Sequence, residues 1–182
     1  MGRTQYYTAT TLDGFIATPD DSLDWLLTRR QDPGGPLDYT EFIAGVGALA
    51  MGSTTYEWIL RYEFASGDLT AGTWPYRQPV WVFTSRDLPA VPGADVRFVS
   101  GDVVPVHRQM VAAAGEANRW VVGGGDLVGQ FAEAGLLDDI LVMIAPVTLG
   151  AGRPLLPRHV ELELTEVGRN GEFACARYEV VR

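Results

Sequence analysis

The segment Arg119–Leu137, RWVVGGGDLVGQFAEAGLL, constrains the fold of this chain most strongly. Its apolar run Trp120–Val122 is typical of a buried strand, and the glycines Gly123–Gly125 follow at once. Apolar side chains then recur at helical spacing: Leu127, Val128, Phe131, Ala132 and Leu136. The pattern predicts a strand, a glycine turn and a helix. Such a turn lets a ligand approach the backbone, and the free N–H groups of a helix start suit phosphate. A tight turn without any ligand explains the glycines equally well.

Short β-forming runs alternate with amphipathic stretches along most of the chain. The predicted strands are Tyr6–Thr11, Ala48–Met51, Val80–Thr84, Val96–Val99, Trp120–Val122 and Ile140–Val147. Further helices are predicted at Leu23–Leu27 with Asp21 or Ser22 as cap, at Leu37–Ala44, after a Ser53 or Thr54 cap, and at Val106–Ala114. The alternation predicts an α/β fold in which helices cover both faces of a mostly parallel sheet.

The end of the chain has a different pattern. Asn170-Gly171 separates two β-rich runs within Leu162–Val180, which predicts an antiparallel hairpin at the sheet edge. We expect 63–78 to be irregular and 148–154 to be a flexible loop, because both are rich in glycine, proline and threonine. No linker divides the chain, so residues 1–182 are expected to form one domain.

Composition excludes several functions. A net charge of −9 argues against a nucleic-acid binder. One cysteine, Cys175, and two separated histidines, His107 and His159, argue against a metal site. We expect both histidines to be on the surface and Cys175 to be a small buried or surface residue of the last hairpin. Without an apolar leader or a membrane-length run, the expected location is the cytoplasm.

Four loops follow predicted strands, where open α/β sheets bind ligands. They contain TLDGFIA, GALAMGSTTYE, VWVFTSR and the long run WVVGGGDLVGQFAEAGLLDDILVMIAPVTLGAGRPLL. In this order the pieces resemble the dihydrofolate reductase-like superfamily, and most closely the reductase domain of the riboflavin-biosynthesis deaminase-reductase. The resemblance implies a dihydrofolate reductase-like three-layer α/β/α fold. Asp138 and Asp139 resemble the Asp-Glu of the family, and we expect them in a solvated turn.

The resemblance also implies a bound NADPH. The residues it assigns to the cofactor are Gly52, Ser53, Thr54, Thr55, Thr84, Ser85, Arg86, Val122, Gly123, Gly124, Gly125, Asp126 and Leu127. Family members commonly have arginine where Ser53 stands, and the position of Asp126 is sometimes basic. Arg86 is the remaining local cation for a 2′-phosphate, so NADH is also possible.

Four residues are candidates for the substrate side. Asp13 either orients substrate and handles a proton or forms an Asx-turn before Gly14. Asp38 and Phe42 are spaced like a substrate-contacting pair of the reductases, although Asp38 also suits a helix start. Trp25 either stacks on substrate or packs in the core.

The sequence thus predicts a reductase that transfers hydride from NAD(P)H to a small heterocyclic or sugar-linked imine or carbonyl, of the pterin or aminopyrimidine kind. The alternatives are a non-catalytic nucleotide-binding scaffold and a flavin-dependent reductase. The resemblance implies a homodimer, and APVTLGAGRPLLP and the terminal hairpin offer apolar surface for it.

Overall fold

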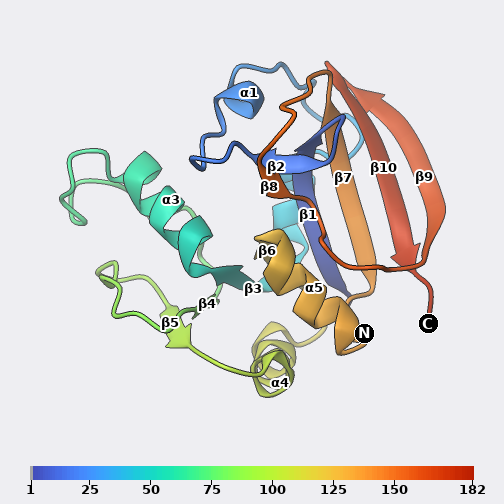
Figure 1. Ribbon diagram of the computed structural model, residues 1–182. Coiled ribbons are helices and arrows are strands. Elements are labelled where there is room, and N and C mark those ends of the chain that lie inside the picture. Colours follow the sequence, from blue (N-terminus) through green and yellow to red (C-terminus); the bar gives the residue numbers. More distant parts are fainter. Residues whose placement is uncertain (1) are drawn as a thin grey trace.

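The computed structural model describes residues 2–182, which build one eight-stranded sheet, a small two-stranded sheet and five helices (Figure 1). The strands are β1 (Thr4–Thr11), β2 (Phe15–Ala17), β3 (Val46–Gly52), β4 (Val80–Phe83), β5 (Val96–Val99), β6 (Asn118–Gly123), β7 (Asp139–Ala145), β8 (Arg153–Pro154), β9 (Leu162–Asn170) and β10 (Phe173–Val180). The helices are α1 (Asp24–Leu27), α2 (Tyr39–Ala44), α3 (Ser53–Glu63), α4 (Val103–Ala114) and α5 (Gly125–Glu133).

The order of the large sheet is β5-β4-β3-β6-β1-β7-β10-β9. All pairings from β5 to β7 are parallel, and β10 is antiparallel to both β7 and β9. This confirms the predicted mostly parallel sheet with its antiparallel C-terminal hairpin. β7 ends at Ala145 rather than at the predicted Val147, since Pro146 has no N–H for the ladder.

Two apolar clusters fill the space between the sheet and its helices. Alternation along β1 directs Tyr7 toward a cluster with α1, α2 and α3, and Tyr6 toward a cluster with α4 and α5. Figure 1 shows α4 and α5 together on one side of the sheet. The predicted three-layer α/β/α arrangement is therefore confirmed.

Some local predictions were wrong. α1 has Leu23 rather than Asp21 or Ser22 as its N-cap, although Ser22 Oγ accepts the N–H of Asp24, the first helical residue, at 3.2 Å. α3 has Gly52 as its N-cap, and Ser53 is already its first helical residue. The 148–154 region is not wholly a loop, because Arg153 and Pro154 form β8 against β2.

The prediction for Asp139 was also wrong. This residue begins β7 with no exposed side-chain surface, and it accepts hydrogen bonds from Arg3 at 2.6 and 2.8 Å, from Gln5 at 2.9 Å and from Arg177 at 3.2 Å. The carboxylate therefore joins β1, β7 and β10. Charged and amide donors replace the water that would otherwise solvate the carboxylate of Asp139. This is why the carboxylate can be buried.

The Asp139→Asn variant should lose about 3 kcal/mol of unfolding free energy. This is the lower end of the range for a broken buried ion pair, because Arg3 and Arg177 remain partly exposed to water. Chemical denaturation measures the loss. Asp95→Asn is the control, since Asp95 and Arg97 form a surface pair, and it should change stability by no more than about 0.5 kcal/mol. Equal effects of the two variants would contradict the role of Asp139.

Candidate cofactor and substrate site

Three of the predicted ligand loops meet where neighbouring parallel strands end. β4, β3 and β6 are adjacent, and Gly52 pairs with Phe83 while Met51 pairs with Gly123. A Cβ built on Gly52 would lie 3.8 Å from both Gly123 O and Gly124 N. The β3–α3 and β6–α5 turns are thus in direct proximity, as expected for a ligand crevice in an open α/β sheet.

Both turns lead into helices that no side chain caps. Gly52 precedes α3 and Gly124 precedes α5, and neither helix has a side-chain hydrogen bond at its N-cap. The first amides of a helix have no intrahelical partner and carry the positive end of its dipole. The hydroxyls of Ser53, Thr54 and Thr55 also make no hydrogen bond within residues 2–182. These donors fit a phosphate group.

The glycines of the second turn have different roles. Gly123 has a φ of 134°, in the region that favours glycine, and its peptide bond to Gly124 is cis. A Cβ on Gly125 would meet the carbonyl oxygens of Pro154 and Leu155, so Gly125 is needed for packing against β8. A Cβ on Gly124 would touch only Ile16 Cδ1, at 4.0 Å. The open space beside Gly124 leaves room for a ligand.

The predicted charges near these turns are already paired. Arg86 donates to Glu57 of α3 at 2.7 and 3.0 Å, and this contact raises the pKa of Arg86. Thr84 Oγ1 accepts the Arg86 N–H at 3.0 Å, which orders the loop after β4. Asp126 accepts from Gln130 at 3.0 Å and from Arg158 at 2.7 Å, and both bonds lower its pKa. Arg158 therefore offsets the negative charge of Asp126.

Asp13 ties two loops together. Its carboxylate accepts hydrogen bonds from Thr11 Oγ1 at 2.6 Å, Gly150 N at 2.7 Å and Leu149 N at 3.1 Å. The Thr11 bond and the backbone bonds lower the pKa of Asp13. The carboxylate thus links the loop after β1 to the loop after β7. A carboxyl group held as an acceptor is a poor proton donor, so the geometry favours positioning over proton transfer.

Asp38 and Phe42, which were predicted to contact the substrate, lie at the start of α2 and within it. Asp38 is the N-cap of α2 and accepts from Glu41 N and Gly34 N, both at 3.1 Å. Phe42 stacks on Tyr7 with ring centroids 4.2 Å apart and meets the edge of Trp120 at 5.2 Å. Phe42 of α2 therefore packs on β1 and β6, the two strands that lead to the Asp13 loop and to the glycine turn.

Sequence reasoning missed much of this aromatic group. Trp120 meets two tyrosines edge to face, Tyr39 at a centroid distance of 6.1 Å and Tyr76 at 5.9 Å. Tyr76 comes from the 63–78 region that was expected to be irregular. Trp25 is buried in the same cluster, and its indole N–H has no partner within the described residues. The density of aromatic residues in 56–76 is the sequence feature that could have predicted the contribution of this region to the aromatic group.

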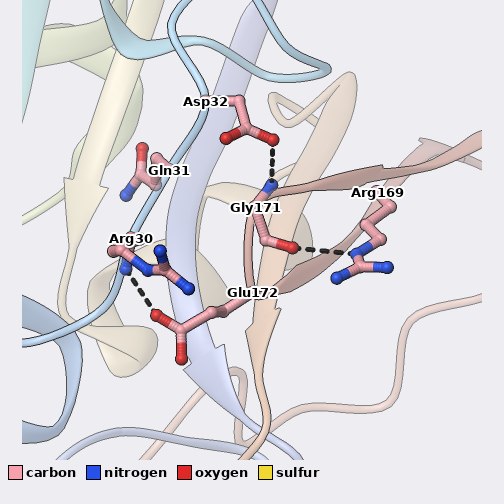
Figure 2. Close-up of a pocket in the computed structure, with 6 residues that line it drawn as sticks. All are labelled: Arg30, Gln31, Asp32, Arg169, Gly171 and Glu172. Carbon is pink, nitrogen blue, oxygen red and sulfur yellow. Dashed lines mark hydrogen bonds between the residues drawn. The ribbon is translucent and has the colours of Figure 1, made fainter.

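One cavity lies away from these turns. Figure 2 shows an opening of about 560 Å³ between the 30–32 segment and the turn of the β9–β10 hairpin. Glu172 accepts from Arg30 N, and Asp32 accepts from Gly171 N. This shallow, charged opening contains none of the predicted site residues. A ligand groove between strand ends is open to solvent and does not need to form a closed cavity, so this opening does not compete with the glycine turns as a cofactor site.

Comparison with known proteins now identifies the family. The RibD C-terminal domain model matches residues 69–173, which is more than half of the chain. The chain belongs to the RibD C-terminal domain family. The uncharacterized protein YwjB of Bacillus subtilis is 29% identical over 180 residues, with 97% of each chain covered.

Solved structures agree with this RibD-type fold. A candidate riboflavin biosynthesis protein of Shewanella sp. PV-4 has a TM-score of 0.80 at 24% identity, covering 99% of each chain. RibD of Acinetobacter baumannii has a TM-score of 0.65 at 14% identity, and this chain spans 58% of it. Dihydrofolate reductase of Enterococcus faecalis, solved with NADP(H), has a TM-score of 0.55 at 14% identity over 99% of this chain. These likenesses confirm the dihydrofolate reductase-like fold.

Proposed function

We propose that this RibD-type chain is an NAD(P)H-dependent reductase of a small heterocyclic or sugar-linked imine or carbonyl. The observation that carries the proposal is the pair of uncapped helix starts, α3 and α5, beside Gly52 and Gly124. Two adjacent helix starts suit the two phosphates of a dinucleotide. Family membership and the fold shared with an NADP(H)-bound reductase support the same assignment.

The residues have distinct proposed roles. Ser53, Thr54 and Thr55 hold phosphate with hydroxyls and amides, while the 84–86 loop faces the adenosine end. The cofactor, when bound, supplies the hydride. Asp13 fixes the loops on either side of the substrate, and water carries the proton because the Asp13 carboxylate is held as an acceptor. Asp38, Phe42 and Trp25 belong to the helices and aromatic face proposed to receive the heterocycle.

The chain is also proposed to act in the cytoplasm. No helix within residues 2–182 has the length and apolar character needed to cross a bilayer.

Replacing Gly124 with Val should abolish NADPH binding without unfolding the protein. A Cβ at this position meets almost nothing in the protein, so the branched side chain fills the space left for the cofactor. Quenching of tryptophan fluorescence during NADPH titration measures the affinity, and circular dichroism checks the fold. Unchanged affinity in the variant would reject the site.

A neighbouring glycine gives the matched control. Gly125→Ala should lower the melting temperature, because its Cβ would press on the carbonyls of Pro154 and Leu155. If Gly125→Ala is as stable as the parent, the packing role assigned to this glycine is wrong.

The preference for NADPH over NADH should depend on Arg86, and the ion pair of Arg86 with Glu57 should weaken it. Arg86→Ala should weaken NADPH binding several-fold and leave NADH binding nearly constant, since only NADPH carries the 2′-phosphate. Glu57→Gln should strengthen NADPH binding, because Arg86 is then freed from its carboxylate partner. Dissociation constants for both cofactors test this, with Arg97→Ala as a surface control. Equal losses for NADH and NADPH in Arg86→Ala would contradict the assignment.

We further propose a homodimer formed through the β9 edge of the sheet. β9 is the terminal strand, and Leu162, Leu164 and Val167 are 38%, 54% and 72% exposed. An unpaired, partly apolar strand edge favours pairing with another chain. Light scattering should give about twice the 19.8 kDa chain mass, and Val167→Lys should reduce it. A constant monomer across concentrations would overturn the proposal.

A further inference from the structure

A second cavity, of about 330 Å³, lies at the amino ends of the central strands, whereas the glycine turns lie at the carboxyl ends of the strands. It is lined by Gly2, Arg3, Thr4, His107, Arg119, Gly135, Leu136, Asp138 and Arg182. Thr4 begins β1, Arg119 is the second residue of β6, and Asp138 immediately precedes β7. Because these parallel strands all start here, the cavity is separate from the proposed cofactor site at their carboxyl ends.

Arg119 is a buried cation that forms no ion pair within residues 2–182, although the charge of Asp138 acts on it. The residue is 5% exposed, and its Nη1 has no hydrogen-bond partner within the described residues. Its Nε and Nη2 donate only to Thr4 Oγ1, at the long distances of 3.4 and 3.3 Å. Burial lowers the pKa of Arg119 and the charge of Asp138 raises it, but a guanidinium stays charged in proteins. A buried charge with no partner is costly, which indicates that an anion belongs in this cavity.

The nearby carboxylates are already committed to other groups. Asp138 accepts from Arg182 at 2.6 Å and from Thr4 N at 2.7 Å. Asp139 is shared by Arg3 and Arg177, and Glu179 also pairs with Arg3 at 3.2 Å. Within residues 2–182 the guanidinium of Arg119 is therefore not in an ion pair, although the chain has a net charge of −9.

His107 completes the cavity wall. Its Nε2 lies 2.8 Å from Thr4 Oγ1, the same oxygen that accepts from Arg119. The single hydroxyl proton of Thr4 is thus free to be donated to Nε2, which requires a neutral imidazole. Burial, and then the charge of Arg119, lower the pKa of His107, while Asp138 raises it. An anion in the cavity would favour the protonated ring, whose Nε2–H would then donate to Thr4 Oγ1 and leave the Thr4 hydroxyl proton free for the anion.

We propose that this cavity binds a phosphate group, with Arg119 as its buried counter-charge and with Arg3, Arg182 and His107 around it. Several cationic donors that converge from different elements match the multiple acceptor oxygens of phosphate better than the two of a carboxylate. The cavity has room for inorganic phosphate or for the phosphoryl group of a monoester. Occupancy stabilises the junction of β1, β6 and β7 and does not depend on the proposed reductase activity.

Titration of inorganic phosphate at constant ionic strength tests the site. His107 and His159 are the only histidines, so NMR resolves each ring. Phosphate should shift the His107 resonances saturably and raise the His107 pKa, whereas exposed His159 should not respond. Ribose 5-phosphate in parallel distinguishes the source: tighter binding of the sugar phosphate indicates a monoester ligand, and equal or weaker binding indicates free phosphate.

Three variants make the test decisive. Arg119→Gln should weaken phosphate binding by at least about tenfold, as expected for loss of a charged hydrogen-bond partner. Arg182→Gln, at an exposed position that should not impair folding, should also weaken it. Arg169→Gln alters the cavity of Figure 2 instead and should leave binding unchanged. A response that does not saturate, or that is equal in the parent and the Arg119 and Arg182 variants, would mean an adventitious ion only and would overturn the proposal.

Discussion

The close approach of β3 and β6 at their carboxyl ends is the constraint on which the site depends. Gly52 and Gly123–Gly124 allow two strand ends to turn into two helices at nearly the same place. Side chains at these positions would fill the space between the turns. The result is a pair of helix starts whose amides are left for a ligand, on a sheet whose mostly parallel order aligns its strand ends.

The chain is acidic overall, but the charged side chains beside the two glycine turns are paired. Glu57 holds Arg86, and Arg158 holds Asp126, so a cofactor phosphate meets neither a free guanidinium nor an unpaired carboxylate. In the proposed complex, binding would rely on backbone amides and hydroxyls, and recognition of the 2′-phosphate would require Arg86 to exchange one anionic partner for another. An anionic cofactor would then be compatible with a chain whose net charge is −9.

The sequence predicted the fold well because its strongest signals are local. The apolar run Trp120–Val122, the three glycines and Asn170-Gly171 each specify their own backbone geometry, and the structure has them as β6, the β6–α5 turn and the terminal hairpin.

Contacts between distant segments were not predictable in this way. The burial of Asp139 requires Arg3 and Arg177 to converge on it, and β8 exists only because β2 lies beside it. The loop contacts of Asp13 also join residues 136 positions apart. The chemical roles of the site residues remain predictions.

Backbone amide NMR during NADPH titration tests the central claim most directly. The account predicts that the amides of Ser53–Thr55 and Gly125–Leu127 shift together and saturably, because they donate to the cofactor phosphates. The amides of the 30–32 segment and of the hairpin turn at Gly171 should be unaffected. Saturable shifts confined to other strands, with both helix starts unchanged, would contradict the account.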